Sequence, residues 1–282
     1  MKIILASPRG FCSGVKHAID LAEKILRTEK KPVYIFHELV HNQTIVNELK
    51  TKGAVFVDDM TEIPDGSVVI FSAHGVSKKI KQQAEQKHLK IFDATCAIVQ
   101  HIHRLIQRVS AEKKECLLIG HAKHPEVEGA LGQYDGEGIY LIENLNGVAQ
   151  LILKNPATCI YVTQTTLSAD ETKNIIAALH QKFPELPQQS GNICHATQER
   201  QNAVKELAKQ ANKIIVIGSQ NSSNSTRLKE LAEQFCPAFL VDSPQELSLN
   251  DFSEQDIIGI TAGASAPEKL VQETIAWFQK NF

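Results

Sequence analysis

Residues 9–26 read RGFCSGVKHAIDLAEKIL, in which one cysteine, Cys12, stands directly before an amphipathic helical pattern. The same arrangement recurs twice, because residues 92–109 read FDATCAIVQHIHRLIQRV and residues 191–208 read GNICHATQERQNAVKELA. Each segment leads through a short run to a single cysteine, and apolar residues at helical spacing follow it. A layout that recurs in this way predicts three similar structural units, each presenting one thiol at the start of a helix.

Short runs rich in Val, Ile and Leu alternate with helical patterns along the whole chain. The expected strands are residues 2–7, 33–36, 54–57, 68–73, 90–94, 116–120, 138–142, 159–163, 213–218, 238–242 and 256–261. Continuous apolar strands separated by helices are typical of parallel sheets that are covered on both faces. We therefore expect an α/β fold in which three pseudo-equivalent units with mainly parallel sheets surround one shared site.

The boundaries of these units follow from the repeated layout, because no low-complexity linker divides the chain. Unit one is expected over residues 12–95, unit two over 96–193 and unit three over 194–282. The run that leads to each of the last two cysteines ends the preceding unit. By the same logic, the strand within residues 1–11 should complete the sheet of unit three.

Length, composition and charge exclude several classes of protein. With 282 residues and 43% hydrophobic content, the chain can form sizeable cores. The formal net charge of −2 does not point to a nucleic-acid or membrane-surface partner. The N-terminal apolar run is too short for a signal peptide, and no stretch reaches the ~18 apolar residues of a membrane span. These features predict a soluble, cytoplasmic protein.

The six cysteines differ in their surroundings. A set beside or within apolar strand-like runs, where a free thiol acts as a small hydrophobic side chain, comprises Cys116, Cys159 and Cys236. The set at loop-to-helix junctions, where the helix N-terminus favours a thiolate, comprises Cys12, Cys96 and Cys194. A disulfide framework is not expected in a long cytoplasmic α/β chain. Three thiolates could hold zinc or an iron–sulfur cluster with one open iron, although their spacing matches neither a zinc ribbon nor a small ferredoxin.

Polar motifs follow six of the expected strands, at the end where open α/β sheets bind their ligands. These motifs are FHELVHN (36–42), AHGVS (73–77), GHAKHPEVEG (120–129), TQTTLS (163–168), GSQNSSNS (218–225) and TAGASAP (261–267). Histidines, hydroxyls, an amide and helix N-termini can bind a phosphate or diphosphate without a large Lys/Arg patch. The candidate residues for this role are His41, His74, His124, Ser222, Ser223, Asn224 and Ser265. Ordinary helix capping by the serines, and surface or core roles for the histidines, are the alternative explanation.

Glu126 stands two residues after His124, and Pro125 occupies a helix-opening position between them. An acidic side chain in a first helical turn complements the helix dipole, which is one explanation for Glu126. The other is that Glu126 donates a proton to a substrate oxygen, with Thr165 as a hydrogen-bonded relay. Glu128 is a second candidate for the same role.

Taken in their order along the chain, the motifs resemble those of 4-hydroxy-3-methylbut-2-enyl diphosphate reductases, the last enzymes of the non-mevalonate isoprenoid pathway. The resemblance covers nearly the whole chain and rests on PRGFCSGVKHAI, HELVHN, SAHGVS, DATCAIVQ, IGHAKHPEVEG, YVTQTTLS, the helix after Cys194, GSQNSSNSTRL and TAGASAP. It implies an oxidoreductase that converts (E)-4-hydroxy-3-methylbut-2-enyl diphosphate to isopentenyl diphosphate and dimethylallyl diphosphate by reductive dehydroxylation.

The resemblance also assigns roles to the residues above. It implies one [4Fe–4S] cluster per chain, whose ligands are Cys12, Cys96 and Cys194 and whose fourth iron is open to the substrate hydroxyl. Glu126 would donate the proton and Thr165 would lie near that hydroxyl. The diphosphate would be bound by His41, His74, His124, Ser222, Ser223, Asn224 and Ser265. No GxGxxG follows a strand and no flavin signature occurs, so an external ferredoxin or flavodoxin is the expected electron donor.

Two other functions fit three widely spaced cysteines. One is a non-redox cluster dehydratase or synthase of the quinolinate synthase type, which should carry arginines for a dicarboxylate, and the loops contain no arginine cluster. The other is an iron–sulfur sensor or electron carrier, which would not need six polar strand-end loops.

Overall fold

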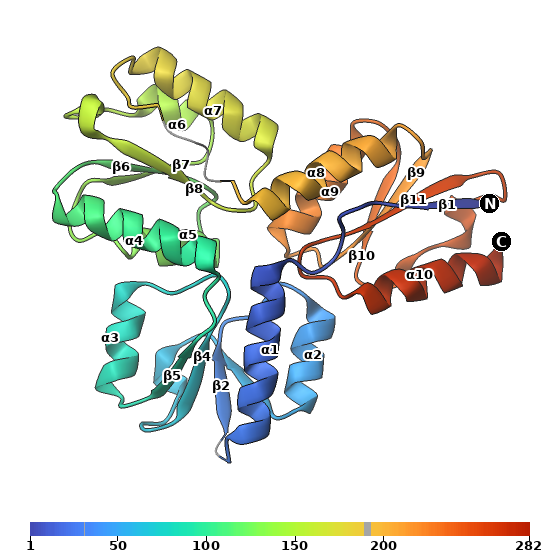
Figure 1. Ribbon diagram of the computed structural model, residues 1–282, viewed down its shortest axis with the longest axis horizontal. Helices are drawn as coiled ribbons and strands as arrows, with labels where there is room; N and C mark the ends of the chain where they lie inside the picture. The colour runs from blue at the N-terminus through green and yellow to red at the C-terminus, as the bar shows by residue number, and fades with distance from the viewer. Residues whose placement is uncertain (31, 189–192) are drawn as a thin grey trace. The chain divides into compact units, whose positions relative to one another are not determined.

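Parallel sheets form from the strand runs that the sequence indicates (Figure 1). The computed structural model describes residues 1–30, 32–188 and 193–282. The chain divides into two compact units: a first of residues 1–16, 40–48 and 194–282, and a second of residues 17–39 and 49–193. The predicted α/β class with parallel sheets is confirmed.

The first unit contains a four-stranded parallel sheet with the order β1-β11-β9-β10. Its strands are β1 (Lys2–Leu5), β9 (Lys213–Ile217), β10 (Ala238–Val241) and β11 (Ile257–Ala262). Strand β1 pairs with β11, so that Lys2 lies opposite Ile257 and Leu5 opposite Ile260. This is the pairing that the repeated layout predicts for the N-terminal strand. The boundaries of the three expected units stay a prediction.

Both faces of this sheet are buried, which explains why its strands are apolar at successive positions. Along β9, Ile214 and Val216 belong to the core packed by α8 (His195–Ala208) and α9 (Ser223–Glu233). Ile215 and Ile217 belong to the opposite core, which α10 (Glu268–Asn281) covers (Figure 1). Successive side chains of a strand point to opposite faces, so a strand that helices cover on both sides is mostly apolar along its length.

The second unit contains a sheet with the order β3-β2-β4-β5 and another with the order β7-β6-β8. The first of them consists of β2 (Val33–Phe36), β3 (Ala54–Val57), β4 (Val68–Phe71) and β5 (Lys90–Asp93). Its associated helices are α1 (Ser13–Thr28), α2 (Gln43–Thr51) and α3 (Lys78–Gln86). The division between the units falls within α1 and within α2.

The other sheet of the second unit consists of β6 (Cys116–Ile119), β7 (Ile139–Ile142) and β8 (Ile160–Thr163). Its helices are α4 (Ala97–Ala111), α5 (Pro125–Leu131), α6 (Leu145–Gln150) and α7 (Ala169–Lys182). Cys116 and Cys159 are fully buried in the cores on its two faces, as predicted. Burial raises the pKa of Cys159 to about 12 and also raises that of Cys116, so both thiols stay protonated. Cys236 is partly buried against the core of the first unit.

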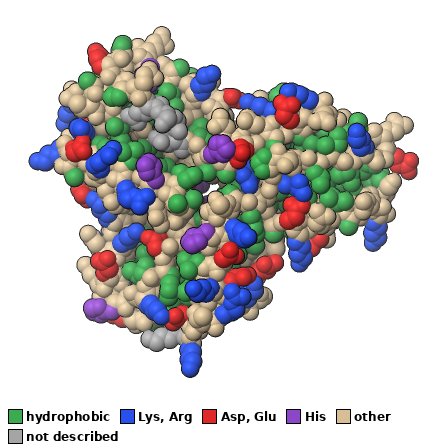
Figure 2. All heavy atoms as spheres, in the orientation of Figure 1, with side chains coloured by type: hydrophobic (Ala, Val, Ile, Leu, Met, Phe, Trp, Pro, Cys, Tyr) green, Lys and Arg blue, Asp and Glu red, His purple; other side chains and the backbone are tan. Residues whose placement is uncertain are grey.

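The surface carries charges of both signs. On the face drawn in Figure 2, Lys and Arg side chains are interspersed with Asp and Glu, in keeping with the formal net charge of −2. Within the described ranges, no helix has both the length and the apolar character that crossing a membrane requires.

Candidate active site

Each of the three junction cysteines stands at the start of a helix. Cys12 lies directly before α1, and its sulfur accepts a hydrogen bond from the Val15 N–H at 3.4 Å. Cys96 and Cys194 are the N-cap residues of α4 and α8. None is in a disulfide and all are partly exposed. A helix N-terminus is a favourable place for a negatively charged group, so these positions suit cysteines that bind a metal.

The Cys12 loop is held against the loop that follows β11. The Gly10 N–H donates to the Ala262 carbonyl at 3.1 Å, and the Cys12 N–H donates to the Ala264 carbonyl at 3.1 Å. Gly10 has a φ of +66°, a left-handed conformation that favours glycine. The pairing of β1 with β11 therefore places Cys12 beside the AGAS loop that carries Ser265.

The candidate anion-binding residues of the first unit gather at neighbouring strand ends. Ser222 is the N-cap of α9, and the Ser265 hydroxyl donates to the His41 carbonyl at 2.8 Å. Asn224 is only 4% exposed, and neither polar atom of its amide has a hydrogen-bond partner among the described residues. A Cβ placed on Gly263, in the neighbouring loop, would lie 3.4 Å from the Asn224 amide nitrogen. Because buried amides are normally hydrogen-bonded, Asn224 is suited to bind a polar ligand.

In the second unit, Glu126 and Thr165 form a buried pair. Glu126 is 4% exposed in the first turn of α5, and Thr165 follows β8. One carboxyl oxygen, Oε1, accepts the Thr165 backbone N–H at 2.7 Å, and the other, Oε2, lies 2.7 Å from the Thr165 hydroxyl. The predicted relay contact between these side chains is therefore present in the structure.

Two histidines belong to the same unit as this pair. His124 is the N-cap of α5, and its Nδ1 accepts the Glu126 N–H at 3.2 Å. A neutral His124 must therefore carry its proton on Nε2. The His74 ring lies edge-on to the His124 ring, with 5.8 Å between centroids, and its Nδ1 is 3.4 Å from the Ser72 hydroxyl. The loops after β4 and β6 thus bring two predicted ligand-binding imidazoles together.

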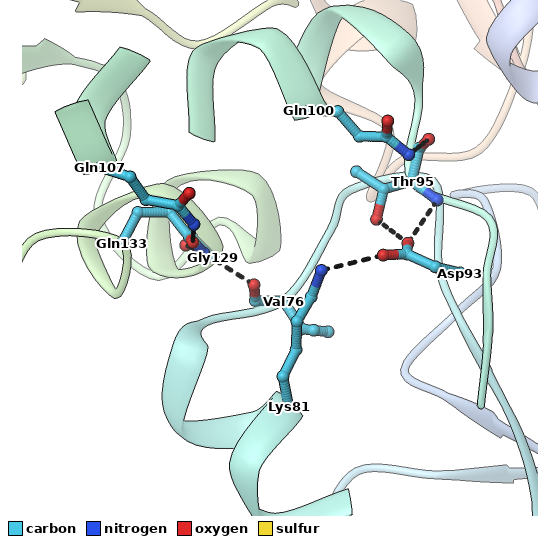
Figure 3. Close-up of polar contacts among 8 residues, drawn as sticks. All are labelled: Val76, Lys81, Asp93, Thr95, Gln100, Gln107, Gly129 and Gln133. Atoms are coloured by element: carbon cyan, nitrogen blue, oxygen red, sulfur yellow. Dashed lines mark hydrogen bonds and ion pairs between the residues drawn. The ribbon is translucent and has the colours of Figure 1, made fainter. Parts of the chain in front are cut away.

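A polar network fixes the turn that presents Cys96 (Figure 3). The Asp93 carboxylate accepts the Thr95 N–H at 3.0 Å and the Thr95 hydroxyl, and pairs with Lys81 at 2.9 Å. Burial alone would raise the pKa of Asp93, but the hydrogen bonds from Thr95 and Lys81 outweigh it and hold that pKa below its ordinary value. Gln100 donates to the Thr95 carbonyl at 3.0 Å, which ties the turn to the helix that Cys96 begins.

A second set of contacts holds α5, which carries Glu126, against the loop after His74 (Figure 3). The Gln133 amide nitrogen donates to the Val76 carbonyl at 2.9 Å and to the Gly129 carbonyl at 2.7 Å. A Cβ on Gly129 would lie 3.1 Å from the Gly75 carbonyl oxygen, so the helix approaches the loop closely. This contact needs a residue without a side chain.

His103 packs beneath the same loops. It is 6% exposed, and a Cβ on Gly75 would lie 2.7 Å from its ring and 3.0 Å from Thr95. Burial lowers the pKa of His103 to about 4, so its imidazole is neutral near pH 7. It therefore fills the space between the loop of His74 and the turn of Cys96 without adding a charge.

Every candidate site residue falls within the described residues, divided between the two units. The first unit holds Cys12, His41, Cys194, Ser222, Ser223, Asn224 and Ser265. The second unit holds His74, Cys96, His124, Glu126 and Thr165. The described ranges contain no group of three or more His, Cys, Asp or Glu side chains arranged to hold a metal ion. The assignment of site residues stays a prediction.

The supporting residues were not among the sequence candidates. The role of Asp93 could have been found from the local sequence, since an Asp two residues before a Thr can accept a hydrogen bond from the backbone N–H of that Thr. The role of Gln133 could not be found in this way, because its hydrogen-bond partner Val76 is distant in sequence. The same is true of Arg200, whose guanidinium bonds to the Gly10 carbonyl across 190 residues.

Comparisons with known proteins agree along the whole chain. The family model described as "LytB protein" matches residues 3–279. A 4-hydroxy-3-methylbut-2-enyl diphosphate reductase from Hahella chejuensis is 52% identical over 280 residues, which are 98% of this chain and 88% of the relative. The one from Tolumonas auensis is 51% identical over 279 residues, covering 98% of this chain and 90% of the relative.

Solved structures of two such enzymes are also similar. The E-1-hydroxy-2-methyl-but-2-enyl-4-diphosphate reductase of Plasmodium falciparum aligns with a TM-score of 0.92 at 36% identity, over 98% of this chain and 87% of that one. A second structure, described as the terminal enzyme of the non-mevalonate pathway, aligns with a TM-score of 0.71 at 32% identity, over 99% of both chains.

Proposed function

The chain belongs to the LytB protein family, and from this premise we propose that it reduces (E)-4-hydroxy-3-methylbut-2-enyl diphosphate to isopentenyl and dimethylallyl diphosphate. The family is one of iron–sulfur oxidoreductases, so the chain is an enzyme of that class. The observation that carries the specific reaction is the buried Glu126–Thr165 pair, a carboxyl group in contact with a hydroxyl in a chain that matches these reductases over nearly its full length.

The donor set fits an iron–sulfur cluster with an incomplete set of protein ligands. Cys12, Cys96 and Cys194 are outside disulfides and stand at helix starts, whereas the thiols of Cys116 and Cys159 are buried and held protonated. We assign the first three as ligands of one [4Fe–4S] cluster per chain. When bound, such a cluster supplies single electrons and an iron atom that can take an oxygen ligand.

The diphosphate is assigned to the polar strand-end loops. The buried amide of Asn224 offers both a donor and an acceptor, and Ser222 and Ser223 stand at the N-terminus of α9. Helix N-termini favour anions through their free N–H groups and dipole. The remaining residues assigned to the diphosphate are His41, His74, His124 and Ser265. Holding this end of the substrate fixes where its hydroxyl lies, which is the positioning contribution to catalysis.

Glu126 and Thr165 are assigned to proton transfer. The reaction breaks the allylic C–O bond and forms a C–H bond, so it takes up two electrons and two protons and releases water. Hydroxide is a poor leaving group, and a proton delivered to the oxygen makes water leave instead. A protonated Glu126 can pass its proton along the 2.7 Å contact from Oε2 to the Thr165 hydroxyl and on to the substrate. The electrons are proposed to come from an external ferredoxin or flavodoxin.

Turnover tests this function. The protein is purified without oxygen, reduced with a low-potential donor and given the allylic diphosphate, and the products are separated by chromatography. We expect both isopentenyl and dimethylallyl diphosphate in amounts that match the reductant consumed. Loss of water without consumption of reductant would instead indicate a non-redox dehydratase, and bleaching without any product would indicate an electron carrier.

A further inference from the structure

Arg200 is a buried cation on α8 that the assigned chemistry leaves unexplained. It is 3% exposed and lies six residues after Cys194. Among the parts of the chain that the structure describes, no carboxylate lies within ion-pair distance of its guanidinium. Arginine is almost never fully buried without a counter-charge, because removing the charge from water is unfavourable.

Within the described ranges, the hydrogen-bond partners of the guanidinium are backbone carbonyl groups. Its Nε and Nη2 atoms donate to the Gly10 carbonyl at 3.1 and 2.6 Å, and its Nη1 donates to the Ala196 carbonyl at 2.7 Å. Gly10 lies two residues before Cys12, and Ala196 lies two residues after Cys194. One side chain therefore bonds to the backbone beside the two junction cysteines of the first unit, Cys12 and Cys194.

The segment that Arg200 binds is itself fixed. The Gly10 N–H bonds to the last residue of β11, Ala262, and the Cys12 N–H bonds to Ala264 in the loop that follows. The carbonyl that accepts from Arg200 thus belongs to a short loop with few free torsions, and Ala196 belongs to the first turn of a helix. A planar guanidinium that bonds to both restrains the separation of the two cysteines more firmly than a flexible ammonium could.

The electrostatic surroundings point to the same two thiols. Burial lowers the pKa of Arg200, and its electrostatic interactions with Cys12, Cys194 and Glu199, in that order of size, oppose this effect. Three thiolates on an iron–sulfur core leave a net negative charge, which increases when the cluster accepts an electron. Such a group is the counter-charge that the buried guanidinium lacks among the carboxylates.

We propose that Arg200 is a positioning residue that holds Cys12 and Cys194 at their binding separation and provides the internal positive charge that stabilises the reduced cluster. The inference rests on the proposed function, because it takes the two cysteines as cluster ligands. Arg200 would contribute in two ways: its hydrogen bonds would fix the separation of Cys12 and Cys194, and its charge would raise the reduction potential of the cluster.

Two variants separate these contributions. Arg200→Gln removes the charge, and Arg200→Lys keeps the charge but loses the planar fork. Arg9→Gln is the matched control, because Arg9 lies on the same loop but is already paired with Glu268 at 2.6 Å. The cluster potential of each anaerobically purified protein is measured by redox titration followed by EPR. Hydrogen exchange at the Cys12 N–H is measured in the cluster-free proteins.

We expect Arg200→Gln to lower the ratio of reduced to oxidised cluster at a fixed potential by on the order of tenfold, or about 59 mV for a one-electron couple. Arg200→Lys should keep the potential of the original protein, and both variants should exchange the Cys12 N–H faster. Arg9→Gln should change neither quantity. A loaded Arg200→Gln protein with an unaltered potential would overturn the assigned charge effect.

If Arg200→Gln takes up no cluster, the Arg200→Lys variant tests whether the charge or the hydrogen bonds of Arg200 are needed. Restored loading in Arg200→Lys supports the role of the charge, and failed loading together with unchanged hydrogen exchange overturns the proposal. A chain with native Arg200 that binds no cluster refutes the proposed function instead. The hydrogen exchange of the cluster-free variants still tests the hydrogen-bonded restraint in that case.

Discussion

Replacing Glu126 by Gln removes the proposed proton donor with little change in shape. The amide oxygen can still accept the Thr165 N–H, and the amide NH₂ can donate to the Thr165 hydroxyl, so both 2.7 Å contacts have a substitute. What is lost is the charge of the carboxylate and the proton of the acid. The exchange of charged for neutral hydrogen bonds should lower the free energy of unfolding by roughly 1 kcal/mol.

The effect on turnover should be much larger. General acid catalysis contributes about 10²–10⁴-fold, so we expect kcat to fall by that factor, equivalent to about 3–5 kcal/mol of activation free energy. The assay is steady-state turnover of the allylic diphosphate under anaerobic conditions, with iron content and thermal unfolding measured on the same samples. Equal iron content and a small change in stability would show that the loss is chemical.

Glu128 supplies the matched control. It lies on the same short helix but is exposed, so Glu128→Gln should leave kcat nearly unchanged. Thr165→Val, which removes the hydroxyl and keeps the backbone N–H bond, should lower kcat without reducing the iron content. Glu126 is not the proton donor if Glu126→Gln turns over within a few-fold of the original protein, or if Glu128→Gln loses as much activity.

Three further outcomes are expected. Cys96→Ser should yield protein with little iron and sulfide, while Cys236→Ser, at a partly buried core position, should keep both; full iron in the first variant would remove Cys96 from the ligand set. His41→Ala should raise KM for the diphosphate about tenfold or more, since a hydrogen bond to a charged group is lost, and a fall in kcat alone would place His41 at the hydroxyl end. Folding lowers the pKa of His103 from 6.5 to about 4, so between these pH values its side chain binds fewer protons in the folded chain than in the unfolded chain. The contribution of His103 to stability is therefore complete above pH 6.5 and is lost as the pH falls toward 4. Between pH 6.5 and pH 4 this effect should account for about 3 kcal/mol of the free energy of unfolding. Urea titrations should therefore show that the stability of His103→Gln depends less on pH than that of the original protein. An equal pH dependence of the two proteins would contradict the lowered pKa of His103.

Much of the secondary structure could be predicted because its signals are local. Each observed strand lies within one of the expected apolar runs, except that β11 extends one residue further, to Ala262. Strands that helices cover on both faces are mostly apolar, which makes them recognisable in the sequence. The helix starts at the three cysteines follow from the abrupt change to helical periodicity. The pairing of β1 with β11 joins segments that are far apart in sequence. It could be predicted because, in the repeated layout, the strand that leads to each cysteine belongs to the sheet of another unit.

The contacts that support the site could not be predicted in the same way. Arg200 stands in an ordinary-looking helical segment, and nothing near it in sequence indicates that its guanidinium meets Gly10. Gln133 likewise joins Val76 to the helix of Glu126, although no periodicity connects these positions. Such bonds depend on which chain segments the sheets place side by side. Motifs can therefore name the groups that react, while the residues that hold them need the folded structure.

We propose that Cys12, Cys96 and Cys194 hold one [4Fe–4S] cluster whose open iron binds the substrate. The most direct test is iron and acid-labile sulfide content, with EPR spectra of the reduced, anaerobically purified protein before and after the allylic diphosphate is added. We predict one cluster per chain and a spectrum that changes when the substrate is added, but not when inorganic diphosphate is added. A colourless protein without iron, or a cluster whose spectrum is indifferent to the substrate, would contradict it.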